Sequence, residues 1–376
     1  MLFIYNIIID ILLGTFLMKK TFAILIALTC FIFSLCLSAC SPTVDSFSLS
    51  YFNTHIYIQS VDKTISQSTK NKLNHLFSSL QNEFDISNQN SFVYNFNSAP
   101  VGTTLVLSEQ GVEIFEKTIK CYNFTDKLFN PAIYPLTQLW QFSPNYPVEN
   151  FEVPNDVDIA NTLTLVDFES ISFDKSTKTV TKTKPNVKLD FGGILKGYAS
   201  EKAMQILLDD GHTKGYVSVG SSSINILQCE KLDVRHPRQT KEKPLIFSID
   251  TSKLKNVSIS SSGDYEKVYN VGDNSYCHII NPFDGKPTTT GIQSVTILGI
   301  DGISADALST ALCLLEHDTE NASNSKLISM LNKIQSTYPN AMIFVAFDNG
   351  KTKQIITNQA KKDFVLYDNT YTIVNF

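Results

Sequence analysis

The amino-acid sequence predicts an α+β fold in which helices and strands mix within a single domain over residues 51–376. Segments with helical spacing and segments with strand alternation follow one another without a regular βαβ period, which argues against a doubly wound parallel sheet. The composition of 43% hydrophobic and 18% charged residues is typical of a folded protein with a sizeable core. No internal repeat or convincing linker interrupts this stretch, so we expect one compact unit.

The first part of this domain is predicted from its hydrophobic periodicity. An alternating segment at 51–59 predicts a strand. Leucine, isoleucine, valine and phenylalanine residues at helical spacing predict helices over 67–84 and 108–124, the second behind a capping Ser108. The polar residues 85–97 between these two helices predict a loop.

The remainder alternates more closely between strands and helices. Helices are expected at 192–210, where a Gly-Gly pair precedes the helical pattern, and at 304–315 and 324–338. Strands are expected at 171–180, 187–191, 215–227, 244–250, 258–261, 277–280, 294–298, 341–347, 352–356 and 364–371.

Charge and cysteine content restrict the class of protein. The net charge of −5 and the absence of a basic stripe argue against a nucleic-acid partner. Four cysteines outside the N-terminal region are widely spaced without a CxxC pair, which favours buried free thiols over a metal site. They are Cys121, Cys229, Cys277 and Cys313. Disulfides remain an alternative if the protein is exported.

The N-terminal region is typical of a secretory leader. Met18-Lys19-Lys20 precedes an apolar run that ends in Leu-Ser-Ala-Cys at Cys40. This ending resembles a bacterial lipobox, which implies a leader over 1–39, acyl chains on Cys40 and a place on the extracytoplasmic face of the cell membrane. Met18 is a better start than Met1, and residues 41–50 have the polar composition of a tether. An uncleaved transmembrane anchor is the alternative, at the short edge of a span.

A first stretch with chemical content is Asp190-Phe191-Gly192-Gly193-Ile194-Leu195-Lys196-Gly197-Tyr198-Ala199. Two glycines allow the backbone to turn sharply and approach a ligand, and the helix that follows offers free N–H groups to an anion. Lys196 adds a mobile positive charge. An ordinary strand-to-helix turn is the alternative reading of this stretch taken alone.

A second stretch places Asp306 and Thr310 four residues apart at a predicted helix start, and therefore on one face. A carboxylate and a hydroxyl are hard oxygen ligands of the kind that Mg²⁺ takes. An aspartate that complements the helix dipole is the alternative. A third stretch carries His278 in a short strand before a Pro- and Gly-rich turn, where the imidazole is either a base or a hydrogen-bonded core group.

Taken in order, these stretches resemble the FAD:protein FMN transferase family, often called ApbE. The run from Asp190 to Ala199 resembles D-L-G-G-I-A-K-G-Y-A, and the run from Ala305 to Thr310 resembles A-D-A-L-A-T. Ser262-Gly263-Asp264-Tyr265 and His278-Ile279-Ile280-Asn281-Pro282 resemble S-G-D-Y and H-I-I-D-P. The segment from Phe129 to Phe142 resembles F-D-P-T-V-G-P-L-V-x-L-W-G-F.

The resemblance implies an ApbE-like, T-fold-related catalytic domain with mixed sheets and packed helices. Family members bind FAD and Mg²⁺, transfer the FMN moiety to a Thr or Ser hydroxyl of a protein, and release AMP. The implied acceptors are exported or membrane proteins. FAD hydrolysis to FMN and AMP, or flavin binding without catalysis, are the alternatives.

The resemblance also assigns roles by position. It implies a metal site at Asp306, Thr310 and the Gly193 carbonyl, with His278 as the base that takes the hydroxyl proton. The residues implied to contact the flavin nucleotide are Phe52, Leu128, Phe129, Asn130, Asp190, Lys196 and Ile280.

The chain departs from the family pattern at several positions. Asn130 and Asn281 replace aspartates, and Ser87 stands where an aromatic group is usual. A common G-G-D appears here as Gly220-Ser221-Ser222-Ser223. Ser309 stands where some members have a further acidic ligand.

Overall fold

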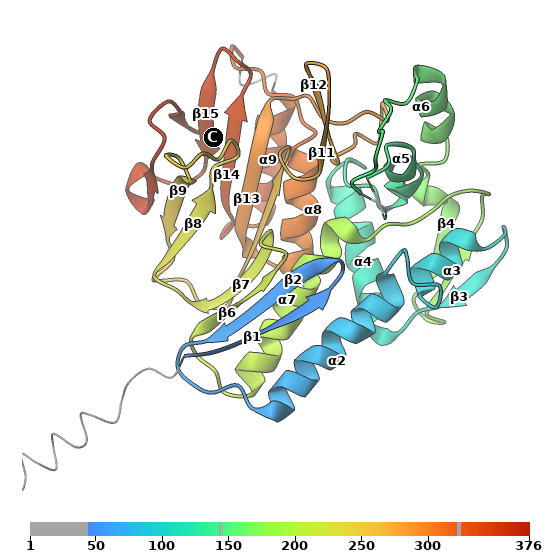
Figure 1. Cartoon of the computed structure of the whole chain (residues 1–376), viewed down its shortest axis with the longest axis horizontal. Coiled ribbons are helices and arrows are strands. Elements are labelled where there is room, and N and C mark those ends of the chain that lie inside the picture. The colour runs from blue at the N-terminus through green and yellow to red at the C-terminus, as the bar shows by residue number, and fades with distance from the viewer. Residues whose placement is uncertain (1–43, 143, 145, 322–324) are drawn as a thin grey trace, which may run out of the picture. The chain divides into compact units, whose positions relative to one another are not determined.

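The computed structural model describes residues 44–142, 144, 146–321 and 325–376, and the stretch from Asp45 to Phe376 forms one compact unit. It is an α+β structure around a nine-stranded sheet with the order β1-β2-β6-β7-β10-β13-β14-β15-β17 (Figure 1). The predicted leader and Cys40 lie outside the described residues.

Neighbouring strands of this sheet are antiparallel except β15 and β17, which pair in parallel. The strands are β1 (Asp45–Tyr51), β2 (Thr54–Ser60), β6 (Gly215–Val219), β7 (Ser223–Gln228), β10 (Val257–Gly263), β13 (Ile292–Ile300), β14 (Met342–Asp348), β15 (Lys353–Thr357) and β17 (Thr372–Asn375).

Helices cover one face of the sheet. The central pair is α7 (Gly192–Asp209) and α8 (Gly302–Leu312), with α2 (Gln67–Phe84) packed beside α7. Helix α4 (Glu109–Phe124) contacts α8, while α9 (Lys326–Thr337) shares a buried core with β13 and β14. The two central helices thus pack against the middle strands of the sheet.

A small sheet packs on part of the other face of the large sheet. It contains β8 (Lys231–Arg235), β9 (Leu245–Asp250) and β16 (Phe364–Leu366) in the order β16-β9-β8. Phe247 of β9 stacks on Phe344 of β14 with ring centroids 4.8 Å apart. The residues buried between the two sheets form a second core, which supports the middle strands on the face opposite the helices.

Shorter elements lie around the helical layer. They are α3 (Phe92–Ser98), β3 (Thr104–Val106), η1 (Pro131–Ile133), α5 (Tyr134–Leu139), α6 (Asp156–Leu163), η2 (Phe168–Ser170), β4 (Ile171–Asp174), β5 (Thr179–Lys182), β11 (Val268–Val271) and β12 (Asn274–Cys277). The short helix η4 (Lys361–Asp363) instead precedes β16 of the second sheet and contacts it. Strands β3, β5 and β4 form one small sheet, and β11 and β12 form a hairpin.

The structure confirms the predicted helices at 67–84 and 108–124, the latter with Ser108 as its N-cap. The predicted loop at 85–97 is wrong in part, because α3 occupies its second half behind its own N-cap, Ser91. The predicted strands at 171–180 and 215–227 are hairpins, since each contains a turn between two paired strands.

The predicted tether at 40–50 is also wrong over its last six residues. Strand β1 begins at Asp45 and pairs with β2 from Asp45–Ser60 to Tyr51–Thr54, so these residues belong to the folded unit. Their polar composition reflects an edge strand with alternate residues exposed.

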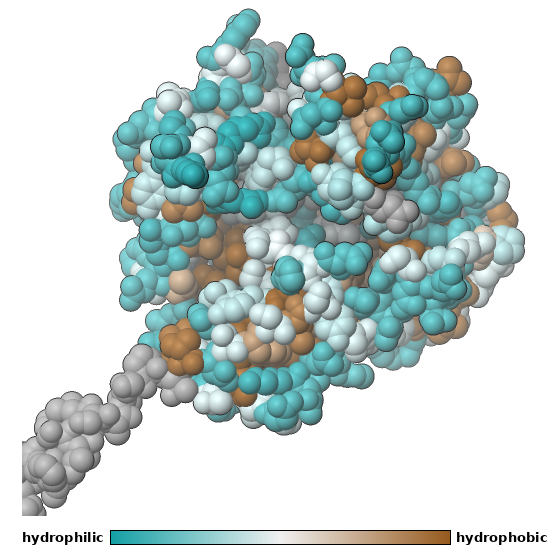
Figure 2. All heavy atoms as spheres, viewed as in Figure 1, coloured by the Kyte–Doolittle hydropathy of each residue, from teal (hydrophilic) through white to brown (hydrophobic). Residues whose placement is uncertain are grey.

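In the part of the chain that the structure describes, no helix combines the length and apolar character needed to cross a bilayer. The face drawn in Figure 2 is largely hydrophilic, with hydrophobic residues in small groups between polar ones. All four cysteines of the described chain have free thiols, as the sequence favoured.

Candidate functional site

The site is built on the contact between α7 and α8, which approach each other through two glycines. A Cβ atom at Gly197 would lie 2.0 Å from the carbonyl oxygen of Gly302, and a Cβ at Gly302 would lie 2.2 Å from the carbonyl oxygen of Gly197. No side chain larger than hydrogen fits at either position without moving backbone. The close approach brings the N-terminal turns of both helices together.

Asp306 lies at this contact and is buried, with only 4% of the surface of the residue exposed. Its Oδ2 accepts the backbone N–H of Gly197 at 2.6 Å. Its Oδ1 accepts the hydroxyls of Ser223, at 2.7 Å, and of Ser260. Since a buried carboxylate without partners is costly, these three donors explain why the charge is tolerated there.

Strand pairing delivers the two serine donors. Ser223 of β7 and Ser260 of β10 are direct cross-strand partners, so their side chains emerge on the same face of the sheet, toward α8. Ser262, two residues further along β10, lies on that face as well. Its hydroxyl lies 2.8 Å from that of Ser309 and 3.2 Å from that of Thr310.

Gly193 and Thr310, two of the three predicted oxygen ligands, lie near each other. A Cβ at Gly193 would lie 4.0 Å from Thr310 Oγ1 and 3.1 Å from the ring of Phe129. One turn further along α7, the Gly197 N–H donates to the Asp306 carboxylate. Gly193 thus lies near the Thr310 hydroxyl, and Gly197 on the same helix contacts Asp306.

This donor set fits one hard divalent cation. It contains a single carboxylate, and no cluster of three or more His, Cys, Asp or Glu side chains suited to a metal occurs among the described residues. The fit depends on Gly193, because a side chain there would fill the space between Phe129 and Thr310.

Asp190 lies just before α7 in a turn fixed by backbone contacts. Its N–H donates to the Pro131 carbonyl at 2.8 Å, and its Oδ1 accepts the Gly192 N–H at 2.7 Å. Burial raises the pKa of Asp190, against the opposing effects of the Gly192 N–H and the positive charges of Lys267 and Lys196. Two positive charges therefore act on the Asp190 side chain in this turn.

The segment before Asp190 is extended but is not a strand of any sheet, contrary to the strand predicted at 187–191. The Asn97 side chain of α3 replaces a strand partner. Its amide donates to the Leu189 carbonyl at 2.9 Å, and its carbonyl oxygen accepts the Leu189 N–H at 2.7 Å. Helix α3, which the sequence did not predict, thus fixes the backbone at Leu189, just before Asp190.

His278 follows β12 and is half-buried, and its backbone N–H donates to the Lys267 carbonyl at 3.2 Å. Its Nδ1 is buried without a hydrogen-bond partner among the described residues, a condition shared only with Asn225 Oδ1. Burial, followed by the positive charges of Lys267 and Lys196, lowers the pKa of His278 to about 4. A pKa of about 4 favours the neutral imidazole at pH 7, and the Nδ1 atom of that ring has no partner among the described residues.

The other predicted contacts occupy varied positions. Asn130 caps η1 by accepting the Ala132 N–H at 2.9 Å, and the Lys196 ammonium donates to the Gly192 carbonyl at 3.1 Å. Ile280 is buried against Leu136 and Trp140. Leu128 is half-buried next to Phe129.

Phe52 is placed apart from this group by its contacts, which are with α2. Its ring meets Phe77 at 6.3 Å, and its N–H donates to the Gln81 side chain at 2.9 Å. Ser87 is exposed, and its hydroxyl donates to Asp85.

Sequence reasoning missed Ser223, Ser260, Lys267 and Asn97. Ser223 was noted only as part of a departure from the family pattern, and nothing local marks a serine whose partner lies on another element. Lys267 follows the S-G-D-Y run by two residues, and its ammonium lies 5.8 Å from the Tyr146 ring centroid. Its relation to His278 depends on a backbone pairing that the sequence alone does not reveal.

Comparison with known proteins gives one consistent family. The family model described as "ApbE family" matches residues 51–330. FAD:protein FMN transferase of Haemophilus influenzae is 23% identical over 80% of this chain and 89% of its own length. The protein of the same name from Buchnera aphidicola is 24% identical over 62% of this chain and 69% of its own length.

Solved structures agree in fold. The ApbE protein of Thermotoga maritima is 25% identical, with a TM-score of 0.71 over 85% of this chain and 98% of its own. The flavin transferase ApbE of Vibrio cholerae is 18% identical, with a TM-score of 0.70 over 86% of this chain and 100% of its own.

Proposed function

Because the chain belongs to the ApbE family, we propose that it transfers the FMN moiety of FAD to a Thr or Ser hydroxyl of an exported or membrane protein and releases AMP. The observation that carries this proposal is the buried Asp306, which accepts the Gly197 N–H of α7 and lies one helical turn before Thr310, whose hydroxyl is near Gly193. That arrangement offers oxygen ligands next to a helix N-terminus suited to phosphate.

The proposed metal is Mg²⁺, held by the Asp306 carboxylate, the Thr310 hydroxyl and the Gly193 carbonyl. When bound, such a cation offsets the negative charge that grows on the diphosphate during transfer. The protein's own contribution is a rigid position for the carboxylate, because Gly197, Ser223 and Ser260 hold it before any ligand arrives.

The proposed nucleotide contacts follow the same turn. Lys196 places positive charge near Asp190, where the anionic diphosphate needs compensation. The other proposed nucleotide contacts are Leu128, Phe129, Asn130 and Ile280, of which Phe129 has its ring against Gly193. Phe52 is a contact proposed from family resemblance alone.

The proposed chemistry is an in-line displacement at the phosphorus that bears riboflavin. The acceptor hydroxyl oxygen forms the new P–O bond, the bond to the AMP phosphate breaks, and AMP leaves with the electron pair. His278 takes the hydroxyl proton, since the neutral imidazole that its low pKa favours is the form able to accept it.

The test uses the chain from Ser41 with FAD and Mg²⁺, with and without membranes from cells that lack the enzyme. AMP release is measured by chromatography, and flavin on protein is detected by fluorescence in a denaturing gel. AMP together with a fluorescent acceptor supports transfer. AMP with free FMN supports a pyrophosphatase instead, and bound FAD without AMP supports a flavin-binding protein.

For the location, we propose lipid attachment at Cys40 on the extracytoplasmic face of the cell membrane, supported by the lipobox-like sequence before it. Two or more acyl chains make such an attachment durable. Cys40→Ser is expected to move the protein from the membrane fraction to the soluble fraction and to remove label from a fatty-acid precursor. Retention of both label and membrane association would contradict the proposal.

A further inference from the structure

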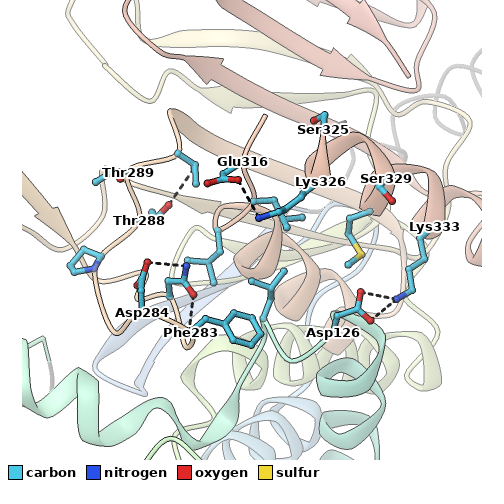
Figure 3. A pocket seen from close by; sticks show the side chains of 17 residues that line it. Asp126, Phe283, Asp284, Thr288, Thr289, Glu316, Ser325, Lys326, Ser329 and Lys333 are labelled. Atoms are coloured by element: carbon cyan, nitrogen blue, oxygen red, sulfur yellow. Dashed lines mark hydrogen bonds and ion pairs between the residues drawn. The ribbon is translucent and has the colours of Figure 1, made fainter. Parts of the chain in front are cut away.

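A groove of about 890 Å³ lies beside the candidate site, between α9, the end of α8 and the loops around residues 126–128 and 281–290 (Figure 3). Its volume is in the upper part of the range typical of binding clefts. None of the residues that line it is one to which we assign the metal or the proton, and only Leu128 is among the proposed nucleotide contacts, so most of the groove is available for another role.

Three chain segments join this groove to the site. Leu128 lines the groove and precedes Phe129, whose ring lies against Gly193. Asn281 lines it and follows Ile280. Leu314 lines it one helical turn after Thr310. The groove and the candidate site are therefore connected along the chain at three places.

The wall of the groove is preformed. The hydroxyls of Thr288 and Thr290 both donate to the Cys313 carbonyl, at 2.7 and 2.9 Å, which ties the loop to the end of α8. The tip of the loop is closed by the Gly285 N–H, which donates to the Asn281 carbonyl at 2.8 Å, and by the Trp140 indole N–H, which donates to the Gly285 carbonyl.

On this fixed loop Phe283 is 58% exposed at the edge of the groove. Its own N–H donates to the Asn281 side chain at 2.9 Å, so the backbone beneath the ring is held in place. An aromatic side chain presented on an ordered loop is a typical anchor for a protein partner, because little conformational freedom is lost on binding.

The charges of the groove argue against a second nucleotide. Its lining contains three carboxylates and two ammonium groups, and both ammonium groups are already paired. Lys333 lies 3.2 Å from Asp126, and Lys326 lies 3.2 Å from Glu316. A diphosphate would meet an excess of negative charge there, whereas an uncharged chain would meet exposed hydroxyls such as those of Thr289 and Ser329.

We propose that this groove binds an extended, uncharged segment of the acceptor protein and directs its Thr or Ser hydroxyl toward the Asp306 site. The inference rests on the proposed transferase function. Phe283 anchors an apolar side chain of the segment, and the hydroxyl-rich side of the groove hydrogen-bonds to its backbone.

The experiment compares two groove variants of the full chain in detergent, Phe283→Ala and Ser329→Trp. Matched controls are Val365→Ala, at a 56% exposed apolar residue of β16, and Ser336→Trp, two turns along α9 and outside the groove. The probe is a library of peptides, each with one threonine among randomised uncharged residues. The readouts are FMN incorporation by mass spectrometry and FAD affinity by flavin fluorescence.

Both groove variants are expected to raise the peptide KM roughly tenfold or more, the effect of losing an anchor or blocking its cleft, with FAD affinity unchanged. The controls are expected to behave as wild type. Equal peptide KM values in wild type and groove variants would overturn the inference while leaving the transferase function intact. A loss of FAD affinity in the groove variants would also overturn it, because the groove would then belong to the nucleotide. A wild-type chain that labels no peptide would contradict both the inference and the function beneath it.

Discussion

The two sides of the candidate site differ in how completely their polar groups are paired. On the side of α7 and α8, Asp306 has three protein donors, and two glycines fix the distance between the helices. On the side of the β11–β12 hairpin, His278 keeps a buried nitrogen without a partner. The first side is organised before a ligand binds, whereas the second keeps a polar atom that has no partner among the described residues.

This difference indicates a division of labour. A paired, rigid carboxylate sets the position of charge at little reorganisation cost, which is what electrostatic stabilisation of a transition state needs. An unpaired imidazole, by contrast, is costly to keep unless it acts on something that arrives. We therefore expect substitutions on the two sides to fail in different ways.

The largest effect is expected for Asp306→Ala, which removes the only carboxylate of the proposed metal site. Loss of several kcal/mol of charge stabilisation predicts a fall in AMP release on the order of 10³-fold or more. The measurement is turnover at saturating FAD over a Mg²⁺ titration. Ser223→Ala is the control, because it removes one hydrogen bond and retains the charge, so its loss is expected to be far smaller. Unchanged turnover in Asp306→Ala would refute the metal role.

The next effect is expected for His278→Asn, on the unpaired side. Removal of a general base predicts a loss of about 10²- to 10⁴-fold in the rate of transfer, with FAD affinity retained. Single-turnover transfer and equilibrium flavin fluorescence separate the two quantities. If FAD affinity falls while the transfer rate of the bound complex stays constant, His278 is a binding residue and not a base.

The same division explains what the sequence revealed and what it did not. The Asp306–Thr310 pair was visible because four residues of helix place both side chains on one face, and a helix is a local structure. Ser223 and Ser260 were not, because their convergence on Asp306 depends on the register between β7 and β10. Non-local pairing of this kind leaves no periodic mark in a single segment.

The fold shows a similar limit. Helix α2 was predicted to its last residue because its apolar spacing is regular. Helix α3 was missed, since its short, asparagine-rich sequence is stabilised by capping and by burial of Phe92, Val93 and Phe96. The strand expected at 187–191 failed for a related reason: its hydrogen-bond partner is the Asn97 side chain and not another strand.

A smaller effect, on stability, is expected for Gly197→Ala. A methyl group there meets the Gly302 carbonyl, so the helices must separate, and overpacking of this kind costs about 1–3 kcal/mol of the free energy of unfolding. Urea denaturation measures the loss. Gly193→Ala on the same helix is the control, because its nearest contact is the edge of a side-chain ring and the cost is expected to be lower. Equal stability of Gly197→Ala and wild type would contradict the tight helix contact.

The smallest effect is expected for Lys267→Gln, which leaves the rate at neutral pH nearly unchanged and alters its pH dependence. Positive charge from Lys267 helps to lower the pKa of His278 to about 4, so the neutral base persists in acid and kcat/KM for wild type falls only as the pH drops through that value. Without the ammonium, protonation of the imidazole becomes easier, and the acid limb is expected to move upward toward the ordinary histidine value of 6.5.

Lys267→Arg retains the charge and is expected to keep the wild-type limb. The profile of kcat/KM between pH 4 and 8 measures the shift, and a limb that moves equally in both variants would show that the charge of Lys267 is not its cause.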